Sequence, residues 1–432
     1  MLQVNEHTIM KNGYRLHIIN SKKFKTIHFT AKLRTNLDRE AITKRALLPF
    51  VLQQGTEKYP SSNLFRRALD ELYGSVMSID GAKKGDHHIL SIRMEVANQA
   101  YLTTEKNILA EGIQFLKEVI FQPKTVNGSF DPKVVEREKQ TLAQKIASII
   151  DDKMSYANMR LIDEMCEQES YRFHVHGYPE DLPGIDAENL FEYYQNCLKH
   201  DEMDLYLLGD FEGMDVESLV ADHFDRTPPS PIPSNERLLK PVHESKEIIE
   251  EQMVQQGKLH LGFRTNITFA DADYPALQIF NAIFGGFPSS KLFINVREKN
   301  SLAYYATSRF ESHKGLLFVF SGIDPKEYRK AKQIILEQVE AMQTGDFTEE
   351  QITEAKKLVQ NQYKETLDDP FGIIEVLFNQ TLADTNRTIE EFFGQLNQTT
   401  KEELIAVANK LELDTVYFLT AQGGKTDGEK TL

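Results

Sequence analysis

The stretch KLRTN, residues 32–36, recurs 230 residues later as GFRTN, residues 262–266. Three more pairs follow in the same order, at offsets that fall slowly from 228 to 211 residues. They are PSSNLF at 60–65 with PSSKLF at 288–293, DD at 151–152 with DD at 368–369, and LYLL at 205–208 with VYFL at 416–419. Four short matches in one order are difficult to obtain by chance. The sequence therefore predicts a tandem duplication of one unit of about 200 residues.

A proline-rich segment separates the two copies. Residues 227–234 read TPPSPIPS. Proline removes a backbone donor and restricts the residue before it, so neither a helix nor a central strand can continue there. We predict an N-terminal domain at 1–226, a linker at 227–245 and a C-terminal domain at 246–432.

The N-terminal copy shows the pattern of a layered α+β unit. Alternating apolar residues are typical of strands, and longer amphipathic stretches are typical of helices. Strands are expected at 14–19, 26–33, 75–79 and 88–96, and helices at 42–54, 62–73, 101–120 and 132–150. This order favours a two-layer α/β sandwich in each copy over a strict βαβ series.

Composition excludes several classes of protein. The 432 residues carry 50 Lys and Arg against 65 Asp and Glu, and this net charge of −15 argues against a nucleic-acid partner. Two cysteines, Cys166 and Cys197, are too few for a disulfide framework or a four-thiolate zinc site. No stretch approaches the ~18 apolar residues of a membrane span, and no signal peptide is visible. We therefore expect a cytoplasmic protein without a membrane partner.

Three motifs carry a resemblance to a known family. QGT at 54–56 ends an early predicted helix, NGYR at 12–15 forms an opening turn, and VREK at 296–299 precedes LAY at 302–304. With the duplication, these motifs resemble the insulinase/pitrilysin superfamily of zinc peptidases, especially its short bacterial, processing-peptidase-like branch. The resemblance implies two halves of the LuxS/processing-peptidase type that together form half of a peptide chamber.

The zinc-binding motif of that family is missing. Active members carry an inverted H-x-x-E-H on the early helix, where two histidines on one face bind zinc and the glutamate is the general base. Counting back from Gly55-Thr56, the three positions are Ala46, Pro49 and Phe50, and none can ligate a metal or move a proton. Pro49 inside a helix would cost roughly 3 kcal/mol, which predicts a kinked helix or one that starts later than in active members.

The family's remaining zinc ligand, a glutamate on a later helix, is missing as well. Residues 136–138, ERE, resemble the start of that helix and place the ligand near residues 143–145. No glutamate occurs between Lys139 and Asp163. Glu136 and Glu138 are interpreted as acids that complement the dipole of a helix N-terminus. We expect no metal or other cofactor in this chain, with zinc in a partner subunit.

The second half retains a pair of residues that the resemblance assigns to substrate binding. In the family, an arginine and a tyrosine from this half hold the peptide carbonyl and stabilise the oxyanion. Arg297 and Tyr304 match that pair, and a slip of one residue in register would replace Tyr304 by Tyr305. On the residues alone, the alternative is that Arg297 pairs with Glu298 or Glu311 and that Tyr304 is a core residue.

The local pattern also predicts how this pair is carried. Arg297 is expected at the end of a short helix capped by Ser289 or Ser290. Tyr304 is expected on the same face of a strand as its neighbours two residues away, Leu302 and Ala306.

Together these features predict a non-catalytic, zinc-free subunit of a heterodimeric metallopeptidase that processes peptides. The chain would lend Arg297 and Tyr304 to a homologous partner that bears H-x-x-E-H, and it would be inactive alone. The alternative is a homodimeric, catalytically inert scaffold or peptide-binding protein of the same fold. The Arg297 and Tyr304 pair discriminates between them, because a scaffold need not keep it.

Overall fold

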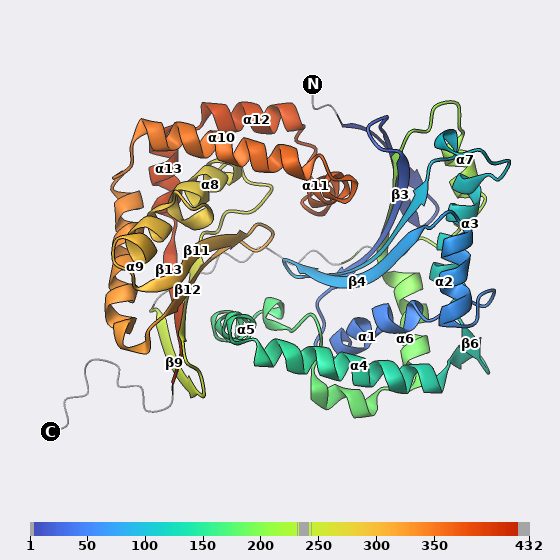
Figure 1. Ribbon diagram of the computed structural model, residues 1–432, viewed down its shortest axis with the longest axis horizontal. Coiled ribbons are helices and arrows are strands. Elements are labelled where there is room, and N and C mark those ends of the chain that lie inside the picture. The colour runs from blue at the N-terminus through green and yellow to red at the C-terminus, as the bar shows by residue number, and fades with distance from the viewer. Residues whose placement is uncertain (1–3, 231, 233–241, 243, 422–432) are drawn as a thin grey trace. The chain divides into compact units, whose positions relative to one another are not determined.

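A computed structural model describes residues 4–230, 232, 242 and 244–421 (Figure 1). They form two compact units. Unit 1 comprises residues 4–148, 173–230 and 369–375, and unit 2 comprises residues 149–172, 244–368 and 376–421. Within the predicted linker at 227–245, residues 231, 233–241 and 243 lie outside the described residues.

Unit 1 is built on a six-stranded mixed sheet in the order β1-β2-β8-β3-β5-β4 (Figure 1). The strands are β1 (Asn5–Lys11), β2 (Tyr14–Asn20), β3 (Thr26–Asn36), β4 (Val76–Lys84), β5 (His87–Ala97) and β8 (Glu202–Gly209), with a separate hairpin of β6 (Thr125–Val126) and β7 (Ser129–Phe130). The helices are α1 (Ile42–Leu52), α2 (Ser62–Glu71), α3 (Ile108–Phe121), α4 (Pro132–Asp151), α6 (Ala187–His200) and α7 (Val216–Ala221). Alternate residues of β3, from Ile27 to Leu33, belong to the core of this unit.

Unit 2 is built on a five-stranded sheet in the order β11-β12-β10-β13-β9 (Figure 1). The strands are β9 (Lys246–Gln252), β10 (Gly257–Arg264), β11 (Ala303–Glu311), β12 (Leu316–Ile323) and β13 (Glu412–Ala421). The helices are α5 (Lys153–Met165), α8 (Tyr274–Asn281), α9 (Tyr328–Gln343), α10 (Glu349–Thr366), α12 (Ile389–Gln398) and α13 (Lys401–Ala408), with π-helical turns at 282–286 and 293–298. Helix α11 (Pro370–Leu382) begins in unit 1 and ends in unit 2. Among the described residues, no helix is both long enough and apolar enough to cross a membrane.

Strand pairing confirms the predicted duplication. In unit 1, Ala31 of β3 lies opposite Leu205 of β8 in an antiparallel ladder. In unit 2, Leu261 of β10 lies opposite Val416 of β13 in the same way. These two pairs are related by the offsets of 230 and 211 residues found in the sequence repeats. The sheets therefore share one topology, and β1 is an additional edge strand of unit 1.

The eight elements predicted between residues 14 and 150 are present, and one of them, the helix expected at 101–120, begins later than predicted. Strands β1, β6, β7 and β8 and helix α7 were not predicted. In β1, the polar residues of its sequence, NEHTIMK, obscure any apolar alternation. The helix expected at 101–120 begins only at Ile108, since Asn107 caps it by accepting a hydrogen bond from the backbone N–H of Ala110. The preceding residues 99–101 form a 3-10 turn instead.

The two compact units are discontinuous in sequence, whereas the predicted domains at 1–226 and 246–432 are continuous. Helix α5 follows the first aspartate pair of the repeat and packs against β10 and β13 of unit 2 (Figure 1). Residues 369–375, at the second aspartate pair, group with unit 1. Asp152 and Asp369 each accept a backbone N–H at the start of the helix, at 3.1 and 2.7 Å. Each copy thus gives a helical segment to the other unit, which a linear division of the sequence does not reveal.

Candidate functional site

Helix α1 carries the three positions of the missing zinc motif. It begins at Ile42, and Pro49 lies inside it, where it cannot donate to the carbonyl of Arg45. Ala46 and Pro49 are buried in the core, and Phe50 is half-buried. The motif face of α1 is therefore packed as core and presents no donor atom to a metal.

A buried ion pair fixes α1 beside the sheet. The guanidinium of Arg45 donates to the carbonyl of Leu33 at 2.8 Å and lies 2.7 Å from the carboxylate of Asp201. Both side chains are almost fully buried, so breaking the pair would leave an uncompensated charge in the core. This contact holds Ala46, the next residue, against the sheet.

A lysine occupies one of the positions at which the family resemblance predicts the glutamate ligand of zinc. Lys145 of α4 falls within the predicted range 143–145, and its Nζ lies 5.6 Å from the centroid of the Phe50 ring. This is a cation–π contact, and it places a fixed positive charge at the former motif. The residues present do not fit zinc, because they supply a cation and no anionic ligand. Within the part of the chain that the structure describes, no three His, Cys, Asp or Glu side chains are grouped to hold a metal.

The loop before α6 brings a histidine close to this lysine. Burial, followed by the charges of Lys145 and His174, lowers the pKa of His176 to about 4. The loop is held by Gly177, whose φ of +74° and contact with Thr43 leave no room for a Cβ atom. The backbone N–H of Tyr178 donates to Thr43 Oγ1 at 3.0 Å. His176 is therefore neutral near pH 7 and adds no further charge beside Lys145.

Tyr304 of unit 2 lies at a β-bulge. Ala303 pairs with Ile323 and Tyr305 pairs with Gly322, so Tyr304 is an extra residue without a partner in the β11–β12 ladder. Its side chain is 76% exposed. The prediction that Tyr304 shares a face with Leu302 and Ala306 is wrong, since both of those are buried. The bulge interrupts the alternation and turns Tyr304 outwards, which also excludes the core alternative.

Tyr305 is packed into unit 2 instead. Lys258 Nζ lies 5.6 Å from its ring centroid, and its ring would contact any Cβ atom at Gly322. Burial, with a smaller contribution from Asp152, raises the pKa of Tyr305 to about 12. Of the two adjacent tyrosines, Tyr304 is therefore the exposed one, and Tyr305 is half-buried.

Arg297 lies in the π-helical turn at 293–298 and is exposed. Its guanidinium stacks 4.6 Å from the centroid of the Phe293 ring. Ser290, rather than Ser289, caps this segment by accepting from the N–H of Phe293 at 3.4 Å. Among the described residues no ion pair involves Arg297, so the alternative pairing with Glu298 or Glu311 is not formed.

A tight turn connects Arg297 to β11. The carbonyl of Arg297 accepts the N–H of Ser301, and that of Val296 accepts the N–H of Leu302, both at 3.0 Å. Ser301 adopts a left-handed conformation with φ of +52° to close the turn. Arg297 and Tyr304 therefore stand at the two ends of one short connection. Their spacing is visible in the sequence, whereas the bulge that exposes Tyr304 has no local signature.

Comparisons with known proteins agree with this architecture. The family description "Peptidase M16 inactive domain" matches residues 184–359. A "Probable inactive metalloprotease" of Bacillus subtilis strain 168 is 44% identical over 98% of this chain and all of its own length. An "Uncharacterized zinc protease", YmfH of the same strain, is 20% identical over 89% of this chain and 93% of its own. The crystal structure of a conserved protein from Enterococcus faecalis V583 is 34% identical, with a TM-score of 0.89 over 98% of this chain and 100% of its own.

The extent of these matches decides the family. The duplicated fold, the two-unit topology and a 44% identical relative that the chain covers completely all agree. The chain therefore belongs to the M16 peptidase family, the insulinase/pitrilysin group that its sequence resembles, as an inactive member.

Proposed function

We propose that this chain is the non-catalytic subunit of a heterodimeric metallopeptidase and that it lends Arg297 and Tyr304 to the active site of a zinc-bearing partner. The observation that carries the proposal is the contrast in exposure between the two candidate regions. Tyr304 is 76% exposed on a bulge, and Arg297, seven residues earlier in the chain, is exposed as well. Large exposed aromatic and arginine side chains are enriched where proteins bind partners or ligands.

The chemistry of the pair suits a peptide substrate. A guanidinium offers several N–H donors in a planar fork, and a phenol offers one O–H donor. Donors of this kind, held where a tetrahedral intermediate develops negative charge, stabilise the transition state of peptide hydrolysis. In the proposed complex, the zinc and the general base belong to the partner, and this chain contributes only donors.

The presence of two types of relative in one organism supports a heterodimer. Bacillus subtilis strain 168 contains both the "Probable inactive metalloprotease" and the zinc protease YmfH, and the chain is similar to each along most of its length. We propose that an organism with both types joins them into one peptidase, with one active site divided between two chains.

The test is reconstitution with a homologous subunit that carries H-x-x-E-H. The two chains are co-expressed, purified together and assayed for cleavage of unfolded peptides. Arg297→Ala and Tyr304→Phe are expected to lower kcat by about 10²–10³-fold for a lost oxyanion donor. Arg309→Ala is the matched control, because Arg309 is also an exposed arginine and lies on β11, the strand that carries Tyr304.

Two outcomes contradict the proposal. If Arg297→Ala and Tyr304→Phe leave the activity of the assembled complex unchanged, this chain contributes no donor to the active site. If the chain fails to associate with the zinc-bearing homologue and forms a stable homodimer, the scaffold alternative is favoured. Analytical ultracentrifugation of each mixture separates these cases.

A further inference from the structure

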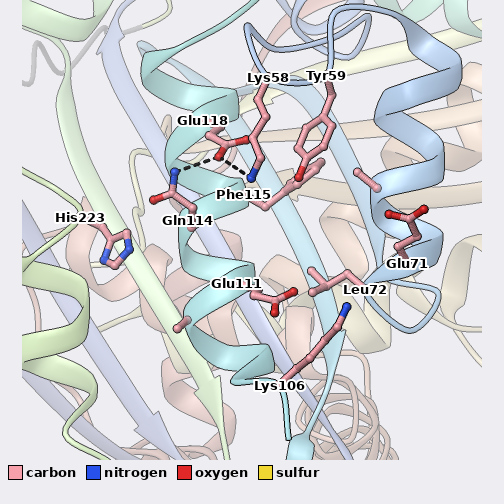
Figure 2. Close-up of a pocket in the computed structure, with 12 residues that line it drawn as sticks. Lys58, Tyr59, Glu71, Leu72, Lys106, Glu111, Gln114, Phe115, Glu118 and His223 are labelled. Atoms are coloured by element: carbon pink, nitrogen blue, oxygen red, sulfur yellow. Dashed lines mark hydrogen bonds and ion pairs between the residues drawn. The ribbon is translucent and has the colours of Figure 1, made fainter. Parts of the chain in front are cut away.

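A pocket of about 350 Å³ lies in the helical layer of unit 1, between α2 and α3 (Figure 2). Residues from the loop after α1 and from the segments that precede α3 and follow α7 complete its wall. It is lined by Lys58, Tyr59, Ala68, Glu71, Leu72, Lys106, Ala110, Glu111, Gln114, Phe115, Glu118 and His223. A volume of this size is typical of sites for small ligands. None of these residues belongs to the missing zinc motif or to the Arg297 and Tyr304 pair.

Glu118 is the feature of this pocket that indicates a ligand. Its side chain is only 3% exposed. One oxygen, Oε1, accepts from Gln114 Nε2 at 2.8 Å and lies 3.4 Å from Lys58 Nζ (Figure 2). The other oxygen, Oε2, is buried and has no hydrogen-bond partner among the described residues. A buried carboxylate oxygen without a donor is unfavourable, so the pocket is matched to a group that brings N–H donors.

Of the two lysines that line this pocket, Lys58 is the one that pairs with Glu118. Lys58 Nζ lies 5.0 Å from the centroid of the Tyr59 ring, and the side chain of Lys58 is 59% exposed. The Lys58 ammonium therefore lies at the margin of the pocket, against the face of the Tyr59 ring. Its distance of 3.4 Å from Glu118 Oε1 is long for an ion pair. The Tyr59 and Phe115 rings lie 5.6 Å apart and form one apolar wall.

Other polar side chains complete the lining. His223 Nδ1 donates to the carbonyl of Leu219 at 2.8 Å. Glu118 is the buried acid of this pocket, because Glu71 pairs with Arg67 at 2.8 Å and Glu111 is exposed to solvent.

We propose that this pocket binds a ligand that carries a primary ammonium group, with the ammonium donating to Glu118 Oε2 and lying against the Tyr59 ring. Such a group is found in free alkylamines and at the amino terminus of a peptide. Both sources present the same three N–H donors, and they differ in the chemical group attached to the ammonium, which is an alkyl chain in one and a peptide backbone in the other.

The proposal is tested by calorimetric titration of the full chain with butylammonium chloride. Saturable binding is expected, and tetramethylammonium is expected to bind at least about tenfold more weakly because it has no N–H to donate. Pentanoate, an anion of similar size, is expected not to bind. Triglycine and its N-acetyl form identify the source. Binding of triglycine alone indicates a peptide amino terminus, and binding of butylammonium alone indicates a free amine. Absence of binding by both would overturn the proposal.

Variants test the site itself. Glu118→Gln keeps the shape and removes the charge, and it is expected to weaken butylammonium binding about ten- to hundredfold. Lys58→Met removes the competing ammonium and is expected to strengthen binding severalfold. Glu354→Gln, at an exposed position of α10, is the control and should leave binding unchanged.

A third variant protects the test against misfolding. Ala110→Leu fills the pocket from α3 without changing any charge and is expected to abolish binding. Thermal melting of each variant shows whether it folds. Equal binding by the wild type and Glu118→Gln, or weaker binding by Lys58→Met, would contradict the assignment of Glu118 as the ammonium acceptor.

Discussion

The two sheets have the same topology, but their side chains differ on the face that packs against a helical segment from the other copy. We call this the exchanged segment: residues 369–375 in unit 1 and helix α5 in unit 2. In unit 1, β3 presents His28, Thr30 and Lys32 on that face, all of them buried. In unit 2, the same face of β10 carries Lys258 and His260, but Phe318 and Phe320 of the neighbouring strand β12 form one apolar cluster with residues of α5. Duplication has therefore preserved the register of the backbone while the side chains diverged. One unit holds its segment by charge, and the other holds it mainly by apolar burial.

Each unit also uses one carboxylate as an anchor that holds the exchanged segment on its sheet. The carboxylate belongs to the segment in unit 1 and to the sheet in unit 2. In unit 1, Glu375 belongs to the exchanged segment and pairs with three cations of the sheet, Lys32, Lys84 and Arg93. Lys32 is 1% exposed at its side chain, so this charge depends on Glu375.

In unit 2, the acid belongs to the sheet. Glu250 of β9 accepts from the hydroxyls of Tyr156 at 2.6 Å and Tyr417 at 2.7 Å. It also accepts from Arg160 Nε at 3.4 Å. Tyr156 and Arg160 belong to α5, and Tyr417 belongs to the sheet. The side chain of Arg160 is 30% exposed, so its charge is better hydrated than that of Lys32 and depends less on its carboxylate.

The largest expected effect is that of removing the anchor of unit 1. Glu375→Ala removes the carboxylate that pairs with the buried Lys32 and is expected to destabilise unit 1 by about 3–5 kcal/mol. Hydrogen exchange read by mass spectrometry should show lost protection in β3 and unchanged protection in β10. The double variant Lys32→Met/Glu375→Leu should recover much of the loss, and a failure to recover would refute the explanation by an orphaned charge.

Acid should weaken the same anchor. Burial would raise the pKa of Glu375, but Lys32, Lys84 and Arg93 outweigh it and lower the pKa from 4.5 to about 2. The unfolded chain therefore binds a proton first, and the stabilisation present above pH 4.5 is lost as pH falls towards 2. Glu375→Gln should flatten this part of the stability profile of unit 1. An identical profile in the variant would show that another group titrates there.

A smaller effect is expected for the anchor of unit 2. Glu250→Ala removes hydrogen bonds to a charged acceptor, and a loss of about 1.5–3 kcal/mol is expected because Arg160, the cation that it leaves, is partly exposed. Urea unfolding followed by hydrogen exchange in β9 and β13 measures it. If Glu250→Ala destabilises its unit as much as Glu375→Ala does, the proposed difference between charge and apolar anchoring is wrong.

Restoring the zinc motif should expose the effect of Lys145. The triple variant Ala46→His/Pro49→Glu/Phe50→His supplies three of the four family side chains. Adding Lys145→Glu should raise zinc affinity at least about tenfold over the triple variant, because it replaces a repelling cation by a ligand. Competition with a chromogenic chelator measures both affinities, and equal values would show that Lys145 does not oppose the metal.

The smallest effects on stability are expected at the exposed pair of unit 2. Tyr304→Ala and Arg297→Ala should each change the free energy of unfolding by no more than about 0.5 kcal/mol, because neither side chain is buried. Tyr305→Ala is the contrasting variant and should be clearly destabilising, since Tyr305 packs against the core of unit 2. Thermal unfolding compares the three, and a large loss for Tyr304→Ala would give it a structural role.

The parts of the fold that depend on local patterns could be predicted. The repeats located the duplication, and apolar periodicity located most strands and helices of the first half. The candidate substrate residues were found by spacing, but the exposure of Tyr304 was not, because a bulge is a mismatch between two strands. The contact between Lys145 and Phe50 was also missed, since it joins α4 to α1 across about 95 residues of sequence.

The sequence by itself determined that one α/β unit occurs twice and that Ala46, Pro49 and Phe50 cannot bind zinc, because both depend only on residue identity and spacing. Only the tertiary structure decided which helical segment covers which sheet, where a buried lysine finds its carboxylate, and which of two adjacent tyrosines faces outwards. Those outcomes depend on side chains that meet across long sequence separations, where burial and charge pairing select one arrangement.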